Sequence, residues 1–207
     1  MVKRVIVYSI GILILALGIV LNTRTGLGVA AVASFAYALN QITGLSLGTA
    51  SMYTYLVPVI IQLSLVRKLD LKIILQIPFS FVFGWILDFY NSYLPIRATN
   101  TINALLLLVL AVLLTASGVY LALKSNLILN PVDGAVKTIS DVFHLPFGKV
   151  KISFDFSFVM LTILVSLLMS GSIIGIGVGT LYAVIMMGNT IQLLSRTFDK
   201  HMERVLA

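Results

Sequence analysis

The chain has 207 residues, of which 59% are hydrophobic and only 10% are charged, and its mean hydropathy is +1.09. A soluble domain carries about 25% charged residues, so a surface this poor in charge must face lipid. The composition excludes a cytosolic enzyme, a secreted disulfide scaffold and a disordered chain. The absence of cysteine also excludes disulfides, thiolate metal sites and a cysteine nucleophile.

Six apolar segments are long enough, or nearly long enough, to cross a bilayer, which takes about 20 residues. They are residues 5–22, 50–66, 71–89, 102–123, 152–170 and 173–194. Lys3 and Arg4 precede the first segment as in a signal peptide, but the apolar run is long and no clear cleavage site follows, so we expect a retained span. Two further segments, 27–43 and 131–143, have helical patterns but are shorter or more polar.

The basic residues indicate how many segments cross. With six spans and both termini on one side, twelve of the fourteen Lys and Arg residues share that side, and only Arg24 and Arg97 lie opposite. If both short segments crossed as well, the division would be eight to five, with Lys137 inside the membrane. Cytoplasmic loops are enriched in basic residues. We therefore expect an all-helical, multi-pass protein of the bacterial cytoplasmic membrane with six spans, two short non-spanning or re-entrant helices and both termini cytoplasmic.

The two halves of this single membrane domain (1–207), residues 1–97 and 98–207, resemble each other at an offset of 100. The matched pairs are Ala16 with Ala116, Gly18 with Gly118, Leu21 with Leu121, Arg24 with Lys124, Leu45 with Leu145 and Gly48 with Gly148, followed by Gly84 with Gly188 at an offset of 104. Each half contains three crossings, an odd number, so the second half would be inserted upside down. Such inverted repeats are common in transporters. The alternative is an ordinary six-helix bundle whose similarity reflects shared apolar composition.

The second short helix begins with strong signals. Asn130 suits the N-cap, Pro131 the first helical position, and Asp133 the positive end of the helix dipole. Asp133, Lys137 and Asp141 then recur every four residues, which predicts one polar stripe. The stripe either lies at the cytoplasmic interface with an Asp–Lys pair or dips into a polar cavity.

The first short helix follows a glycine turn, residues 25–28, whose backbone N–H groups can bind an anionic or polar group. Because Arg24 is adjacent, we predict an outward-facing pocket around residues 24–55. Its polar candidates are Arg24, Tyr37, Gln41, Thr49, Ser51 and Tyr53. The alternative role of the glycines is close helix packing, which is common in membranes.

Ionisable residues within a membrane are functional candidates. Asp155 is either a substrate or coupling carboxylate or the ion-pair partner of Lys151, four residues earlier. Asn130, Asp133 and Asn189 complete the set of substrate-binding candidates. Most intramembrane polar residues are neutral amides, hydroxyls and rings, which suit a small polar or aromatic solute better than a relay of ions.

No nucleotide-binding loop and no hydrolase, metalloprotease or redox signature is present. We therefore expect no enzyme, no catalytic residues, no cofactor and no metal. Active transport would need an ion gradient or another subunit. The expected partners are a small-molecule substrate and the lipid bilayer, with an energising ATPase module as an alternative and no nucleic acid.

The segments TGLG (25–28), TGLSLGTAS (43–51) and NPVDG to FG (130–148) resemble the YczE/YitT-type family of small bacterial membrane proteins. The order of segments matches over most of the chain. The resemblance implies a polytopic cell-membrane protein with a transport-related role, and it transfers no catalytic residues. In the first half, residues 30–33 (AAVA) occupy the positions that NPVD occupies in the second. Any polar contact that NPVD makes is therefore expected in the second half alone.

Three functions are consistent with these features. The first is binding and transport of a small polar or aromatic solute, the size of a vitamin or metabolite, by a carrier with inverted repeats. The second is the substrate-binding subunit of an energy-coupling-factor vitamin importer, because such subunits are similar in size, charge and six-helix topology. The third is a structural, regulatory or lipid-modifying role without transport.

Overall fold

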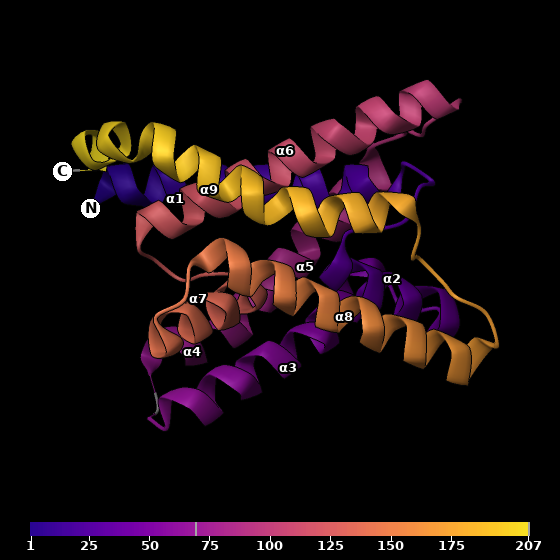
Figure 1. Ribbon diagram of the computed structural model, residues 1–207, viewed down its shortest axis with the longest axis horizontal. Helices are drawn as coiled ribbons and strands as arrows, with labels where there is room; N and C mark the ends of the chain where they lie inside the picture. The colour runs from indigo at the N-terminus through magenta and orange to yellow at the C-terminus, as the bar shows by residue number, and fades with distance from the viewer. Residues whose placement is uncertain (69, 207) are drawn as a thin grey trace.

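The computed structural model describes residues 1–68 and 70–206, which are predominantly helical (Figure 1). The helices in this part of the chain are α1 (Val2–Thr23), α2 (Ala31–Thr43), α3 (Leu47–Val66), α4 (Leu71–Ile74), α5 (Gln76–Tyr93), α6 (Thr101–Ser125), α7 (Pro131–Phe143), α8 (Phe147–Ser170) and α9 (Val178–Leu206). Six segments are long and apolar enough to cross a membrane, namely α1, α3, α4 with α5, α6, α8 and α9. The protein is therefore a multi-pass membrane protein, and the six spans and two short helices predicted from the sequence are confirmed.

The bounds of all six spans differ from those predicted: α1, α3, α6 and α8 begin one to five residues earlier than expected, and the third and last spans differ in other ways. The last was expected at 173–194, but α9 begins at Val178 because the backbone is left-handed at Gly171 and Gly175, with φ of 70° and 75°. α9 also continues to Leu206. The third span is interrupted between α4 and α5, where Pro78 lacks the N–H that would bond to the carbonyl of Ile74.

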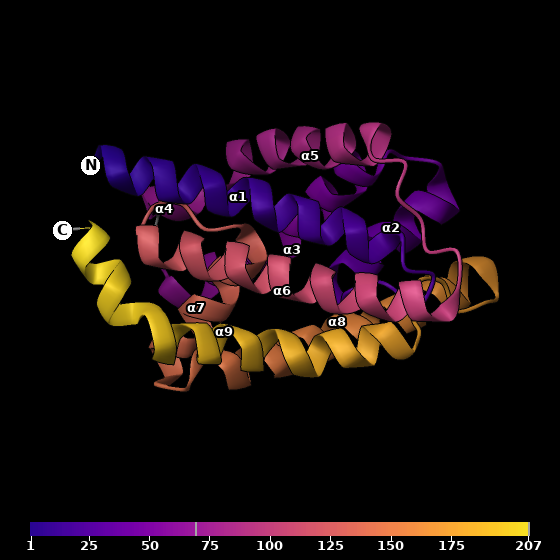
Figure 2. The same cartoon turned by 90° about the horizontal axis from the view of Figure 1, so that it is seen from above.

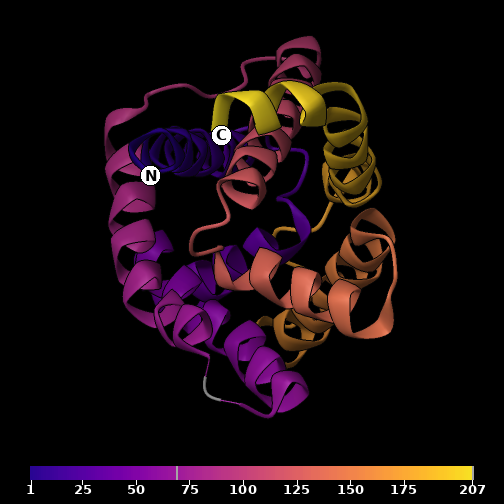
Figure 3. The same cartoon turned by 90° about the vertical axis from the view of Figure 1, so that its left-hand side faces the viewer.

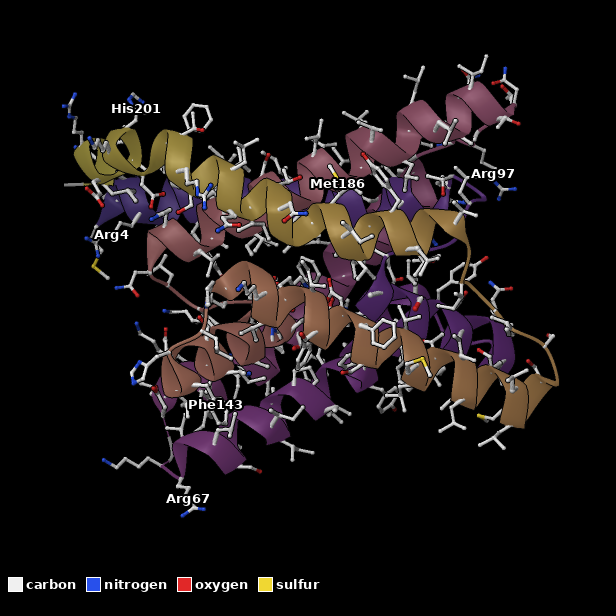
Figure 4. The ribbon with its side chains drawn as sticks, viewed as in Figure 1. Arg4, Arg67, Arg97, Phe143, Met186 and His201 are labelled. Atoms are coloured by element: carbon white, nitrogen blue, oxygen red, sulfur yellow. The ribbon has the colours of Figure 1, made fainter. Side chains whose placement is uncertain are left out.

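Both termini lie at the same end of the molecule (Figures 1 and 2). Figure 4 places Arg4, Arg67, Phe143 and His201 toward this end and Arg97 at the opposite end. The separation agrees with the even number of crossings and with the predicted grouping of basic residues on one side.

The short helices connect the two halves of the chain. α2, from the first half, packs extensively on α8, and α7, from the second half, packs on α3. The other main contacts join α1 to α6, α3 to α5, α6 to α9 and α8 to α9. Seen along the long axis from the end that carries the termini, the helices surround the region where α2 and α7 begin (Figure 3).

The contact between α1 and α6 requires glycine on both helices. A Cβ atom on Gly18 would lie 2.6 Å from the backbone nitrogen of Thr115, and one on Gly118 would lie 2.6 Å from that of Leu15. Ala16 is completely buried beside this contact. Small residues let two membrane helices approach closely, which increases their van der Waals contact.

A second pair of glycine contacts joins α3 to α5 and α8 to α9. A Cβ on Gly84 would lie 3.1 Å from the carbonyl oxygen of Gly48, and one on Gly148 would lie 3.1 Å from that of Gly188. These are the glycines that match between the halves of the sequence. The order of buried, intermediate and exposed positions is also identical along residues 51–60 and 151–160. Corresponding positions of the two halves therefore make corresponding contacts.

Replacement of Gly118 by alanine is expected to destabilise the protein by about 1–3 kcal/mol, because the added methyl group would contact backbone atoms that cannot rotate away. The thermal midpoint of the purified protein in detergent measures the effect. Ser9→Ala, on the exposed face of α1, is the matched control and should leave the midpoint unchanged. Equal midpoints for the two variants would contradict the close packing of α1 on α6.

Candidate functional site

α7 begins inside the protein and ends at its surface. The Asn130 side chain caps the helix by accepting a hydrogen bond of 3.0 Å from the backbone N–H of Val132. The first six residues of α7, 131–136, are buried, whereas Lys137 and Asp141 are exposed and form an ion pair of 3.0 Å. The sequence left open whether the polar stripe lies at a surface or dips into a polar cavity. The structure shows both: Lys137 and Asp141 form an i,i+4 pair at the surface, whereas Asp133 lies inside because the start of the helix dips into the protein.

Asp133 belongs instead to a buried charged cluster with two residues of α8. The ammonium of Lys151 lies 3.0 Å from Asp155 Oδ1 and 3.5 Å from Asp133 Oδ1. The exposed fractions of Asp133, Lys151 and Asp155 are 5%, 6% and 4%. The sequence left open whether Asp155 pairs with Lys151, and the structure shows that it does. With two carboxylates and one ammonium, the cluster carries one excess negative charge when all three groups are ionised.

A buried pair of amides holds the start of α7 in place. Gln62 on α3 and Gln76 on α5 exchange two hydrogen bonds, of 2.7 and 2.9 Å. The same Gln62 Nε2 donates to the carbonyl oxygen of Pro131 at 3.1 Å. A Cβ on Gly134 would lie 2.6 Å from Gln76 Nε2, so only glycine lets α7 approach this pair closely. α3, α5 and α7 are therefore joined at one point, which positions Asp133.

The start of α2 has different chemistry. Its N-cap residue is Ala30, which makes no side-chain cap hydrogen bond, and its first turn contains no acid. The Ala30 N–H donates to Asn22 Oδ1 at 2.5 Å. One turn later, the hydroxyls of Ser34 and Thr162 are 3.1 Å apart and link α2 to α8. α2 is therefore also held by side-chain hydrogen bonds, but the N–H groups of its first turn, residues 31–33, have no side-chain acceptor among the described residues.

The starts of both short helices line one small cavity, of about 60 Å³, together with the charged cluster. The lining combines residues 30–33 of α2 with Asn130, Val132, Asp133, Lys151, Asp155 and Tyr55 and with apolar side chains of α1, α6 and α9. Asn130 Nδ2 lies 3.5 Å from the Tyr55 hydroxyl at its edge. We call this space the central cavity.

Larger cavities lie toward the two ends of the molecule. One of about 400 Å³ is lined by Arg24, Tyr37, Gln41, Asn91 and Arg97 at the end opposite the termini, and we call it the distal cavity. In its wall, Arg24 donates hydrogen bonds to the backbone oxygen and to Oδ1 of Asn91, at 2.6 and 2.7 Å. Cavities of about 370 and 250 Å³ lie toward the end with the termini, both lined in part by Lys137 and Asp141.

The structure divides the predicted substrate-binding residues between these spaces. Arg24, Tyr37 and Gln41 line the distal cavity, whereas Asn130, Asp133 and Asp155 line the central cavity. Ser51 is buried and donates to the carbonyl oxygen of Leu47, and Thr49 bonds to Ser46, the N-cap residue of α3. Tyr53 and Asn189 lie on exposed positions of α3 and α9, outside the cavities described above.

The substrate-binding candidates from the sequence omitted Tyr55 and Lys151, which line the central cavity, and Asn22, which bonds to the start of α2. Lys151 was expected only as a possible ion-pair partner of Asp155. The offset of 100 offered a signal for two of the omitted residues, because it aligns Ser51 with Lys151 and Tyr55 with Asp155. Asn22 gave none, since its bond to the start of α2 depends on the path of the intervening turn.

The model of a protein family described as a family of unknown function (DUF6198) matches residues 2–196. The match includes both short helices and the residues of the central cavity. Neither the comparison with curated proteins nor that with solved structures gave a match. The geometry of the central and end cavities is therefore the basis for a functional assignment.

Replacing Lys151, the positive residue of the cluster, should lower the stability of the protein far more than replacing one of its two carboxylates. Lys151→Met leaves two buried carboxylates without a counter-ion and is expected to destabilise the protein by about 3–5 kcal/mol, whereas Asp155→Asn leaves a neutral Lys151–Asp133 pair and a small effect. Yield and thermal midpoint in detergent measure both. If the two variants were equally stable, the cluster would not behave as two carboxylates that share one ammonium.

Proposed function

Because the chain belongs to the DUF6198 family, whose function is unknown, we propose its function from its own geometry: it carries a small polar solute across the cell membrane. The observation that carries this proposal is the central cavity, where two short helices begin beside a buried charged cluster. Irregular backbone at membrane depth is tolerated where it is buried in protein or lines a water-filled cavity. Ionisable groups at such a depth mark substrate or ion pathways.

The distribution of the cavities supports alternating access to this site. The distal cavity opens near Arg24 and Arg97, and the other two lie near Lys137 at the opposite end. Between them the central cavity is small, about 60 Å³, so the passage between the two ends is constricted there. A carrier needs such a constricted state between its two open conformations.

An inverted repeat is part of the proposal. Two observations support it. Gly18 contacts Thr115 while Gly118 contacts Leu15, at matching positions of the halves. In addition, α2 packs on α8 of the second half, and α7 packs on α3 of the first. In transporters of this plan, discontinuous helices form the substrate site at the repeat interface. The resemblance to the YczE/YitT-type family, which implies a transport-related role, supports the same function.

Two-sided accessibility of the central cavity tests this function without knowledge of the substrate. The chain has no cysteine, so Ala33→Cys introduces a single thiol into the cavity lining. In a carrier, a membrane-impermeant methanethiosulfonate should label this thiol in both right-side-out and inside-out vesicles. Ser166→Cys is the control, because Ser166 is buried, makes no side-chain hydrogen bond and lies outside the described cavities.

The other two functions give different results in the same experiment. Labelling from the outer side alone, with copurification of an ATPase, would support the capture subunit of a vitamin importer. Protection from both sides would support a role without transport. For a carrier, the purified protein alone in liposomes should also take up a solute from a panel of radiolabelled small metabolites.

Orientation is a separate prediction. Because Arg4 and Arg67 lie toward the end that carries the termini, and twelve of the fourteen basic residues are expected to share that side, we propose that this end is cytoplasmic. In intact cells, an impermeant maleimide should label Arg97→Cys but label His201→Cys only after the membrane is permeabilised. The reverse pattern would invert the assignment while leaving the fold intact.

A further inference from the structure

The two short helices both begin at the central cavity. They differ in the side chains that cap their first N–H groups and balance the positive end of their dipoles. α7 has the Asn130 cap and Asp133 in its first turn, whereas α2 has Ala30 and Ala33 at the corresponding positions. The positive end of a helix dipole favours a negative group within its first turn. At α7 the protein supplies that group itself, and at α2 it does not.

A second observation shows an excess of hydrogen-bond donors beside α2. The carboxamide of Asn22 is 2% exposed and bonds to Ala30 through its oxygen, while its Nδ2 has no acceptor among the described residues. Asn22 contacts the N-cap of α2 but is not among the residues that line the central cavity. Residues 31–33 do line it, and the N–H groups of this first turn make no hydrogen bond within the described part of the chain. Buried donors without acceptors are rare in folded proteins, so the start of α2 is suited to an acceptor from a ligand.

The opposite side of the cavity has an excess of acceptors. Asp133 and Asp155 share the single ammonium of Lys151, and their Oδ1 atoms accept no hydrogen bond from any other described group. Both carboxylates are at least nine-tenths buried and line the cavity. A second ammonium group in the cavity would be attracted by the two carboxylates and would offset the negative charge that the single Lys151 leaves uncompensated.

We propose that the central cavity binds a small zwitterion of the amino-acid class, with its carboxylate at the start of α2 and its ammonium between Asp133 and Asp155. The ligand then supplies at α2 the negative group that Asp133 supplies at α7. A cavity of about 60 Å³ holds about four water molecules, which corresponds to a ligand the size of glycine. This assignment rests on the proposed function, because it identifies the solute of the same site.

Three probes of nearly equal size separate the contributions of the two charged groups. Glycine carries both, ethanolamine lacks the carboxylate and glycolate lacks the ammonium. Competition against radiolabelled glycine on the purified full chain in detergent should rank glycine first. Ethanolamine and glycolate should each bind about tenfold more weakly or worse, the difference expected from losing one charge-assisted interaction.

Ala30→Asn tests the carboxylate position specifically. It copies the cap of α7 onto α2, so its side chain should occupy an N–H group that otherwise binds the ligand. We expect a higher thermal midpoint for the ligand-free protein, an affinity for glycine lowered about tenfold, and unchanged binding of ethanolamine. Pro146→Asn is the matched control, because Pro146 also starts a helix without a side-chain cap but lies outside the central cavity. It should leave glycine binding unchanged.

Each contrary outcome overturns the assignment in a recognisable way. Equal or tighter binding of ethanolamine would identify a cation site, tighter binding of glycolate an anion site, and no binding of any probe would exclude small zwitterions. In all three cases, two-sided labelling of Ala33→Cys would still support a carrier. If glycine binds as expected but labelling occurs from one side alone, the ligand class stands and the transport function fails.

Discussion

The burial of Lys151 between Asp133 and Asp155 is the constraint on which the centre of this protein depends. An ion cluster at this depth is stable only if its groups stay paired, so α7 must hold Asp133 within reach of α8. The Gln62–Gln76 pair, the Asn130 cap and the absence of a side chain at Gly134 serve that position. A short helix that would otherwise lie at the membrane surface is thereby held inside the bundle.

The same constraint explains why the two short helices have different roles. Both have the same length, and both begin at the central cavity. The three charged residues that line the cavity come from the second half of the chain, and the corresponding residues of the first half are Ala33, Ser51 and Tyr55. The result is a cavity with a charged wall and a wall of exposed backbone donors, an asymmetry suited to orienting a small ligand.

Much of the fold was predictable, because spans depend on local hydropathy. The start of α7 was predictable from Asn130 and Pro131, and so was an Asp–Lys pair within that helix, which Lys137 and Asp141 form. The partner of Asp133 was not predictable, because Lys151 lies on another helix. Tyr53 and Asn189 were chosen for residue type alone, and which face of a helix contacts a cavity depends on tertiary packing.

The crossing of the short helices onto opposite halves has a mechanical consequence. α2 is bonded to α8 through Ser34 and Thr162, and α7 to α3 through Pro131 and Gln62. α7 is also tied to α8 of its own half by the Asp133–Lys151 ion pair, and α2 also packs on α3, so each short helix bridges both halves. In the proposed transport cycle, a tilt of one half relative to the other would therefore pull on the starts of both short helices and change the shape of the central cavity between them.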